Sequence, residues 1–186
     1  PIEPLPEFMD LYRDQEERLP WGVDEAFDWS LEGRRGYRAM ISQIDHQLGR
    51  ILACLAEKGW LENTIVVYTA DHGEMAGDHG RFGKTCFYEA SVRVPLVFTG
   101  PGIRQGQESP ALVELLDVGK TLCELCAIEP HALDQGQSLL PILQGDREGR
   151  LAGRDTVYAE MGCDKMLCDG RYKLMWGDPA SDTREL

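Results

Sequence analysis

A carboxylate and an imidazole stand side by side at Asp71 and His72, and a lysine follows at Lys84. On a loop at the end of a strand, such a pair can converge on one divalent cation, because the carboxylate supplies charge and the imidazole supplies a neutral nitrogen. The lysine offers a mobile ammonium to a bound anion. The three residue types together predict a site for a metal ion and an anionic ligand.

The chain around these residues is rich in glycine. Four glycines let the backbone turn tightly and approach an anion closely, at Gly73, Gly77, Gly80 and Gly83. His79 lies among them and is a further candidate contact for the anion, although a loop histidine bonded to its neighbours is an equal interpretation. Taken alone, Asp71-His72 is also typical of an N-cap beside a hydrogen-bonded loop histidine.

The elements that must position this segment follow from apolar spacing. Thr64–Ala70 is β-prone and apolar on both faces, which is typical of a buried strand in a parallel sheet covered by helices. Open α/β sheets place their ligand crevice at the carboxyl ends of such strands, where Asp71 begins. The N-terminal residues 1–29 are expected to be extended, with a short helical turn. Apolar spacing predicts helices at 31–58, ending at Gly59, and at 111–127, and a loop with a short helix at 136–143. The expected strands are 93–99 and three antiparallel strands at 156–160, 165–168 and 172–176.

Composition narrows the function classes. The chain has 186 residues, with Lys+Arg 19 against Asp+Glu 32 and a net charge of −13. This acidic balance argues against nucleic-acid binding, which needs a basic face. No run approaches the ~20 apolar residues of a membrane span. The chain opens on Pro1 without a signal peptide, so its N-terminus does not indicate a compartment; bacterial cytoplasm or periplasm is expected.

The order of motifs resembles the sulfatase family of the alkaline-phosphatase-like superfamily. Asp71-His72-Gly73-Glu74 is followed by Gly77-Asp78-His79-Gly80, by Gly83-Lys84 and by Tyr88–Leu96. Upstream, Tyr37–Asp45 with Gly49-Arg50 and Asn63–Val67 are similar to the helix and strand that precede the metal site in that family. Downstream, 116–118, 134–139 and 169–174 match further parts, so the resemblance covers essentially the whole chain.

The resemblance implies an α/β fold: part of an alkaline-phosphatase-like sandwich with helices on a mostly parallel sheet, plus a small C-terminal antiparallel sheet. Residues 1–150 would be the C-terminal part of the sulfatase α/β domain, and 151–186 a truncated antiparallel subdomain. Asp71 and His72 would bind a divalent cation, with calcium expected and manganese or zinc possible, since many sulfatases have Asn at the position of His72. Lys84 would contact the sulfate group and assist the leaving oxygen. Arg93 is expected to pair with Glu89 rather than with substrate.

The sulfatase nucleophile is missing from this sequence. The family makes formylglycine from a Cys/Ser-x-Pro-x-Arg signature, and no cysteine or serine here fits it. The N-terminal aspartates that complete the metal shell are also missing, and two ligands are too few for a closed site. The sequence therefore predicts a fragment of a sulfatase that hydrolyses a small sulfate ester, inactive in isolation, with an oligomeric state that it does not indicate.

Two alternatives remain open. One is a phosphonate or phosphate monoester hydrolase of the same superfamily, which shares the metal strand. The other is a non-catalytic, zinc-stabilised binding module built from Cys123, Cys126, Cys163 and Cys168. Because Cys123 and Cys126 lie in a helical pattern, packing of their thiols is the more common role.

Overall fold

The computed structural model describes residues 3–25, 28–146 and 153–177. The chain forms two compact units: unit 1 is Pro1–Thr64 with His72–Pro95, and unit 2 is Ile65–Asp71 with Leu96–Leu186. The domain boundary expected at residue 150 lies outside the described residues. Each unit is described by itself.

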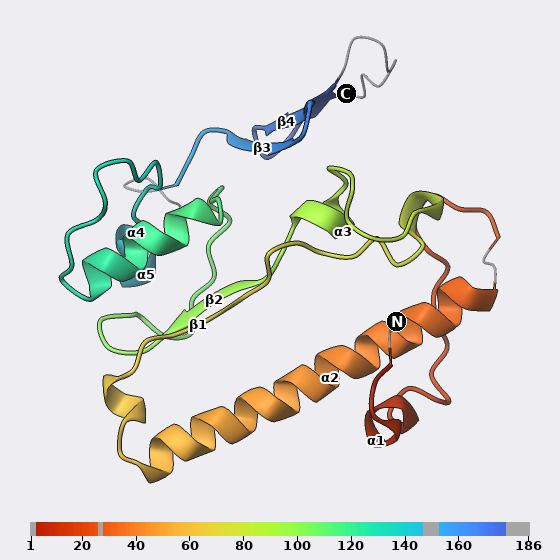
Figure 1. Cartoon of the computed structure of the whole chain (residues 1–186), viewed down its shortest axis with the longest axis horizontal. Coiled ribbons are helices and arrows are strands. Elements are labelled where there is room, and N and C mark those ends of the chain that lie inside the picture. Colours follow the sequence, from red (N-terminus) through yellow and green to blue (C-terminus); the bar gives the residue numbers. More distant parts are fainter. Residues whose placement is uncertain (1–2, 26–27, 147–152, 178–186) are drawn as a thin grey trace. The chain divides into compact units, whose positions relative to one another are not determined.

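Unit 1 is built on one long helix, α2 (Asp28–Glu57), as the three- and four-residue spacing predicted (Figure 1). It ends where expected, and Gly59 has a φ of 68°, a backbone conformation that glycine adopts without strain. The short helix α1 (Pro6–Asp10) lies against α2. Hydrogen bonds join this N-terminal segment to α2: Leu5 N–H donates to Gln43 Oε1 (3.0 Å), the Tyr12 and Ser42 hydroxyls lie 2.6 Å apart, and Arg38 donates to Glu17 (3.0 Å).

One face of α2 carries large apolar side chains that are open to solvent. Ile41, Ile44 and Ile51 are 47%, 49% and 58% exposed. Their spacing of three and seven residues places them in one stripe along the helix. In spite of its length, α2 is too polar to cross a bilayer, and no other helix in the described residues is long and apolar enough.

Unit 2 contains the strand that precedes the candidate site. The strands β1 (Val66–Thr69) and β2 (Leu96–Thr99) pair in antiparallel register, with Val66 opposite Thr99. The parallel pairing expected from the sequence is therefore wrong for this pair. A run that is apolar on both faces predicts burial but does not determine strand direction. The expected burial is also not found, because Val66–Tyr68 are only partly buried and Thr69 is exposed.

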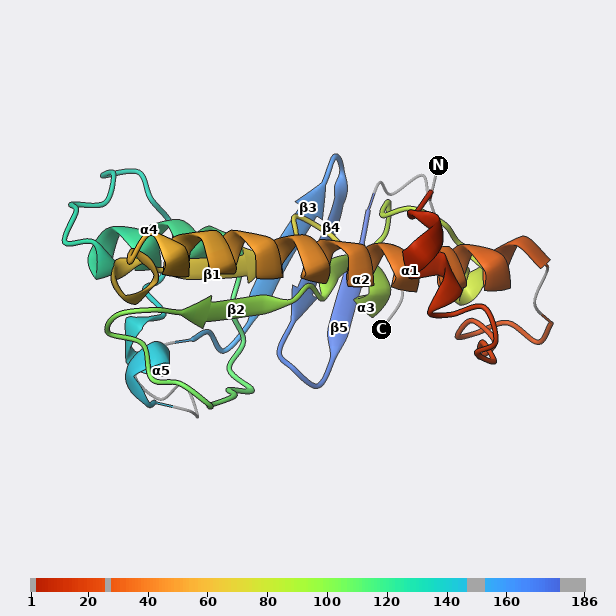
Figure 2. The ribbon, with the colours of Figure 1, turned by 90° about the horizontal axis from the view of Figure 1, so that it is seen from below.

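The C-terminal part of unit 2 is a three-stranded antiparallel sheet, as the sequence predicted. Figure 2 shows its strands β3 (Val157–Met161), β4 (Asp164–Cys168) and β5 (Lys173–Trp176), which pair in the order β3-β4-β5. The turn between β4 and β5 contains Gly170 with a φ of 85°. Asp169 Oδ1 accepts the backbone N–H groups of Tyr172 (2.6 Å) and Arg171 (2.9 Å), and these bonds lower the pKa of Asp169.

This turn should weaken in acid. Because its pKa is lowered on folding, Asp169 contributes stability above the usual carboxyl pKa, and that contribution is lost as pH falls through the lowered value. Below about pH 4, we expect the Tyr172 amide to exchange its hydrogen faster than the pH dependence of the intrinsic exchange rate alone predicts. In Asp169→Asn, which keeps an acceptor oxygen but does not ionise, this additional acid dependence should vanish. If the two proteins show the same pH profile at Tyr172, Asp169 does not stabilise the turn.

Two short helices complete unit 2, α4 (Leu116–Leu125) and α5 (Leu140–Gln144), and unit 1 also contains α3 (Glu89–Val92). Single 3₁₀ turns occur at Leu61–Asn63 and Asp78–Gly80. The sequence predicted that the helix containing α4 begins at 111. It begins later because Leu112 is extended and its carbonyl accepts the N–H of Arg154 (3.0 Å).

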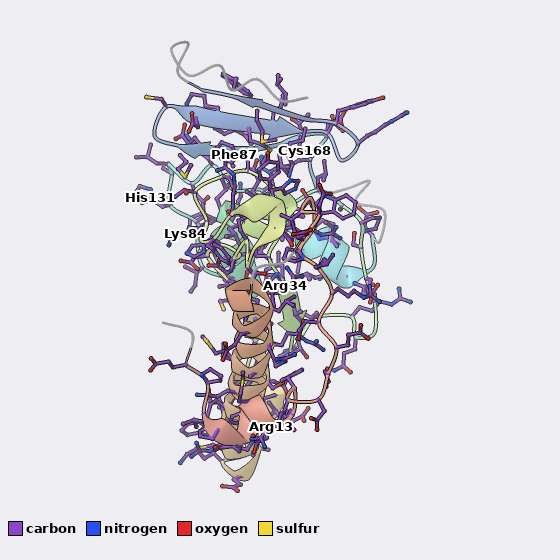
Figure 3. The ribbon with its side chains drawn as sticks, turned by 90° about the vertical axis from the view of Figure 1, so that its right-hand side faces the viewer. Arg13, Arg34, Lys84, Phe87, His131 and Cys168 are labelled. Atoms are coloured by element: carbon purple, nitrogen blue, oxygen red, sulfur yellow. The ribbon has the colours of Figure 1, made fainter. Side chains whose placement is uncertain are left out.

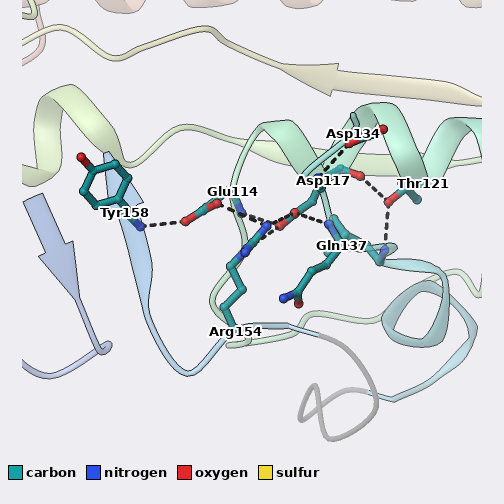
Figure 4. A network of polar contacts seen from close by, with 9 residues as sticks. Glu114, Asp117, Thr121, Asp134, Gln137, Arg154 and Tyr158 are labelled. Atoms are coloured by element: carbon teal, nitrogen blue, oxygen red, sulfur yellow. Dashed lines mark hydrogen bonds and ion pairs between the residues drawn. The ribbon is translucent and has the colours of Figure 1, made fainter. Parts of the chain in front are cut away.

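A buried polar network holds the start of α4 (Figure 4). Asp117 is fully buried and accepts Arg154 Nη2 (2.6 Å), the Gln137 N–H (2.7 Å) and the Glu114 N–H (2.8 Å). Glu114 also pairs with Arg154 (3.3 Å) and accepts the N–H of Tyr158, the second residue of β3. The hydrogen bond that Arg154 donates to Asp117 is the largest contribution that raises the pKa of Arg154, so this guanidinium stays charged at any pH at which the protein is folded.

Candidate functional site

The segment with the candidate residues is a loop closed by its own backbone. The Gly73 N–H donates to Ser91 O (2.7 Å), the Met75 N–H to Gly83 O (2.9 Å) and the Gly77 N–H to Arg81 O (2.8 Å). Met75 and Phe87 are buried beneath it, at 1% and 7% exposure. The loop is thus anchored by apolar side chains while its polar groups remain near the surface.

Gly73 is required by close packing. A Cβ built on it would lie 1.9 Å from the carbonyl oxygen of Ala90, a backbone atom that cannot move aside cheaply. This is the position directly after His72, so any displacement there would also move the imidazole.

We expect Gly73→Ala to destabilise unit 1 by about 2–3 kcal/mol, since the added methyl group forces the backbone of the loop to shift. The matched control is Gly49→Ala in α2, where a Cβ meets nothing within 4 Å. That change should stabilise by roughly 0.5–1 kcal/mol through helix propensity. Urea unfolding followed by circular dichroism measures both. Equal stabilities of the two variants would show that the loop tolerates a side chain at Gly73.

His72 and Lys84 meet in unit 1. The Lys84 Nζ lies 2.5 Å from His72 Nε2, and His72 Nδ1 lies 2.8 Å from the carbonyl oxygen of Gly73. A carbonyl oxygen only accepts, so Nδ1 must carry the proton and donate it to Gly73. Nε2 then holds the free lone pair, which accepts a hydrogen bond from the Lys84 ammonium. This is the tautomer that a metal ligand bound through Nε2 requires.

Asp71 lies two residues beyond β1 and is exposed, as expected for a residue at the carboxyl end of the strand. It belongs to unit 2, whereas His72, Lys84 and His79 belong to unit 1. Within the described ranges, no group of three or more His, Cys, Asp and Glu side chains is arranged to hold a metal ion. Binding of a cation by Asp71 and His72 stays a prediction.

His79 is held by its neighbours. Its ring stacks on Tyr88 at a centroid distance of 4.1 Å, its backbone has a φ of 53°, and its N–H donates to the carbonyl of Trp21 (2.6 Å). Asp78 adds to this anchorage, because its Oδ1 accepts Arg34 Nη1 of α2 and the Trp21 N–H, both at 2.8 Å. Arg34 and Lys84 are labelled in Figure 3. Contact of His79 with an anion stays a prediction.

Two further residues, Glu74 in the loop and Ser91 on α3, were not predicted from the sequence to have a role. Glu74 Oε1 accepts the N–H of Gly83 (2.6 Å) and of Ala76 (3.1 Å), and Ser91 Oγ donates to the carbonyl of Lys84 (2.7 Å). Both hold the backbone on which Lys84 is carried. An acidic residue within a glycine-rich loop was a usable signal for Glu74, since such loops contain unpaired N–H groups. Nothing in the local sequence distinguishes Ser91.

Two expectations about other side chains are also decided. Arg93 pairs with Glu89 at 3.9 Å, as predicted. The four cysteines of the zinc-module alternative are free thiols and are not brought together as a metal site in the described part of the chain. Cys126 is exposed, so the interpretation of its thiol as a packed core group is wrong; it lies at the C-terminal end of α4, where the helix stops covering the interior.

Known proteins are similar to this chain in sequence and in fold. The family model described as Sulfatase matches residues 6–128. Arylsulfatase K of Rattus norvegicus is 42% identical over 152 residues, which cover 76% of this chain and 27% of that protein. A sulfatase of Formosa agariphila is 36% identical over 110 residues, covering 59% of this chain and 22% of that protein.

Two solved structures superpose closely. BT4656 in complex with its substrate D-glucosamine-2-N,6-O-disulfate has a TM-score of 0.74 at 30% identity, covering 84% of this chain and 33% of that one. The phosphonate monoester hydrolase of Silicibacter pomeroyi has a TM-score of 0.71 at 28% identity, covering 80% of this chain and 33% of that one. The chain thus spans about a quarter to a third of the length of these relatives. Because the family model matches more than half of it, the chain belongs to the sulfatase family.

Proposed function

We propose that this chain supplies part of the metal and sulfate site of an enzyme that hydrolyses sulfate esters. The observation that carries the proposal is the contact of Lys84 with His72, which brings an ammonium to the free lone pair of an imidazole that follows a strand end. Sulfatases generally use a divalent cation and formylglycine, and this chain contains no signature for the second. The nucleophile would come from sequence that the longer relatives have in addition.

The candidate ligands fit a divalent cation in their donor chemistry. His72 already has the tautomer that puts the lone pair on Nε2, where a cation would take the place of the Lys84 ammonium, and Asp71 is an exposed carboxylate next to it in sequence. A carboxylate with an imidazole suits manganese or zinc as well as calcium, so we propose the class of ion and not one member. When bound, the cation would polarise a sulfate oxygen and neutralise its charge.

Lys84 would act on the substrate anion. Its ammonium lies at His72 Nε2, on a backbone fixed by hydrogen bonds at Gly83 and at its own carbonyl. A positive group held there stabilises the negative charge that develops on the bridging oxygen as the ester bond breaks. His79, anchored against Tyr88, would line the same loop and contact the anion from the side.

A phosphonate or phosphate monoester hydrolase remains the second candidate, because a phosphonate monoester hydrolase superposes almost as well as BT4656 does. Both reactions need a cation and an ammonium beside a tetrahedral anion. The disulfated sugar that BT4656 binds, and the curated relatives called arylsulfatases, favour the sulfate ester.

If Asp71 and His72 bind a divalent cation, Mn²⁺ should bind selectively at these residues. In the isolated chain, paramagnetic Mn²⁺ should broaden the NMR signals of His72 before those of surface carboxylates. Lys84→Met should bind Mn²⁺ roughly fivefold more tightly, because it frees the Nε2 lone pair and removes a positive charge within a few ångströms of the ion, worth about 1 kcal/mol in water. Asp71→Asn should weaken the broadening at His72.

A charge-matched control makes the result specific. Lys58→Met removes a charge from the same unit without touching the loop, and should leave the Mn²⁺ response unchanged. Since the chain carries a net charge of −13, weak binding across its surface is expected and is subtracted in this way. Broadening that is uniform over the carboxylates, with none selective for His72, would contradict a metal site here.

A further inference from the structure

The loop holds Lys84 through two groups that do not themselves reach toward a ligand. We propose that Glu74 and Ser91 are positioning residues for Lys84, which together hold its ammonium at His72 Nε2. The hydrogen bonds alone show where the ammonium lies. That an ammonium at this place acts on a substrate anion rests on the proposed function.

Glu74 fixes the peptide unit between Phe82 and Gly83, one unit before the peptide that joins Gly83 to Lys84. Its Oε1 accepts the Gly83 N–H at 2.6 Å, and the same carboxylate oxygen accepts the Ala76 N–H at 3.1 Å. The Gly83 carbonyl is also held, because it accepts the Met75 N–H at 2.9 Å. Gly83 has a φ of 78°, so without these bonds its backbone would have the wide freedom of glycine. A charged acceptor makes the stronger kind of bond to a backbone N–H.

Ser91 connects the two functional residues. It is only 3% exposed, its hydroxyl donates to the Lys84 carbonyl at 2.7 Å, and its own carbonyl accepts the Gly73 N–H at 2.7 Å. Gly73 in turn supplies the carbonyl that orients the His72 ring. One buried residue on α3 therefore sets both ends of the contact between Lys84 and His72.

The geometry matters because lysine is flexible. Its four-carbon stem has many rotamers, so an ammonium is placed accurately only if the backbone below it is fixed and a partner waits above it. Glu74 and Ser91 fix the backbone, and His72 is the partner. If the backbone at Gly83 were released, the ammonium would spend less of its time at Nε2.

The test reads the hydrogen bond directly, by NMR on the ¹⁵N-labelled chain. The observables are the ¹⁵N shift of His72 Nε2 and the exchange of the Lys84 ammonium protons with water. Lys84→Met gives the shift of Nε2 without its donor. We expect Glu74→Ala to move Nε2 most of the way to that value and to speed ammonium exchange at least tenfold, with a smaller change in the same direction for Ser91→Ala.

Glu74→Gln provides the rescue, since its amide oxygen still accepts from Gly83 and Ala76; its Nε2 shift should stay near that of the wild type. Glu62→Ala removes an exposed acid elsewhere in unit 1 and should change nothing. Circular dichroism identifies which variants are folded. If Glu74→Ala does not fold, the decision passes to Ser91→Ala. A wild-type Nε2 shift in the folded variants, or failure of Glu74→Gln to rescue, overturns the proposal.

A separate titration with inorganic sulfate tests the proposed function. If sulfate moves the Lys84 signals of the wild-type chain, the anion role is supported. If sulfate leaves them unchanged while the variants behave as expected, positioning by Glu74 and Ser91 stands and the sulfate role fails.

Discussion

Asp117→Ala is expected to destabilise unit 2 by about 3–5 kcal/mol. The change strips Arg154 of its shortest contact while leaving the guanidinium largely buried, and removing one partner of a buried ion pair has this order of cost. It also leaves the N–H groups of Glu114 and Gln137 without their acceptor. Urea unfolding followed by the NMR signal of the Trp176 indole, on β5, measures the effect in unit 2.

The double variant Asp117→Ala with Arg154→Met tests how much of this cost comes from leaving the Arg154 guanidinium buried without Asp117. Because it removes the guanidinium that Asp117→Ala leaves without its shortest contact, while Glu114 keeps the N–H of Tyr158, its stability should recover by about 1 kcal/mol relative to Asp117→Ala alone. The exposed pair of Arg93 and Glu89, 3.9 Å apart, is the control, and Glu89→Ala should change stability by less than about 0.5 kcal/mol. If Asp117→Ala lowers the free energy of unfolding by less than about 1 kcal/mol, water can replace the hydrogen bonds that Asp117 makes.

Lys84→Ala should lower kcat/KM for sulfate-ester hydrolysis by about 10²–10³, the usual loss when one preorganised group that stabilises developing charge is removed. The assay needs a nucleophile, so it uses a chimera in which residues 6–128 replace the aligned segment of rat Arylsulfatase K, with a chromogenic aryl sulfate as substrate. The loss should fall on kcat more than on KM, because the charge on the leaving oxygen exists mainly in the transition state.

Lys58→Ala in the same chimera is the matched control, since it deletes a lysine outside the loop, near Trp60. It should stay within about twofold of the unsubstituted chimera. Lys84→Arg keeps the charge on a planar group with a different reach, and should retain only part of the rate. If Lys84→Ala hydrolyses the aryl sulfate at a rate within threefold of the unsubstituted chimera, Lys84 has no direct part in the reaction.

Local patterns predicted the elements of this fold well and their partners poorly. The apolar spacing of α2 and the Gly59 that ends it are properties of one short stretch, and so is the turn at Asp169-Gly170. The direction of β2 against β1 is not, because 26 residues separate the strands and a connection of that length allows either direction. The start of α4 was missed for the same reason, since the pairing of Leu112 with Arg154 spans the chain between them.

The candidate site divides in the same way. Asp71, His72 and Lys84 could be chosen from the sequence because their residue types are rare together in one glycine-rich loop. The contact between His72 and Lys84 and the tautomer of His72 required coordinates. Ser91 was beyond sequence reasoning altogether: its importance comes from where its hydroxyl and its carbonyl point, and a serine in a short helix gives no hint of either.

The apolar stripe of α2 has a consequence for handling the isolated chain. At low ionic strength, a net charge of −13 keeps copies apart by repulsion over tens of ångströms. Added salt shortens that range but leaves the attraction between exposed Ile41, Ile44 and Ile51 intact, and sulfate salts strengthen it. Sulfate, the anion used to test the candidate site, thus also promotes self-association of the chain. Titrations with sulfate should therefore be done at low protein concentration.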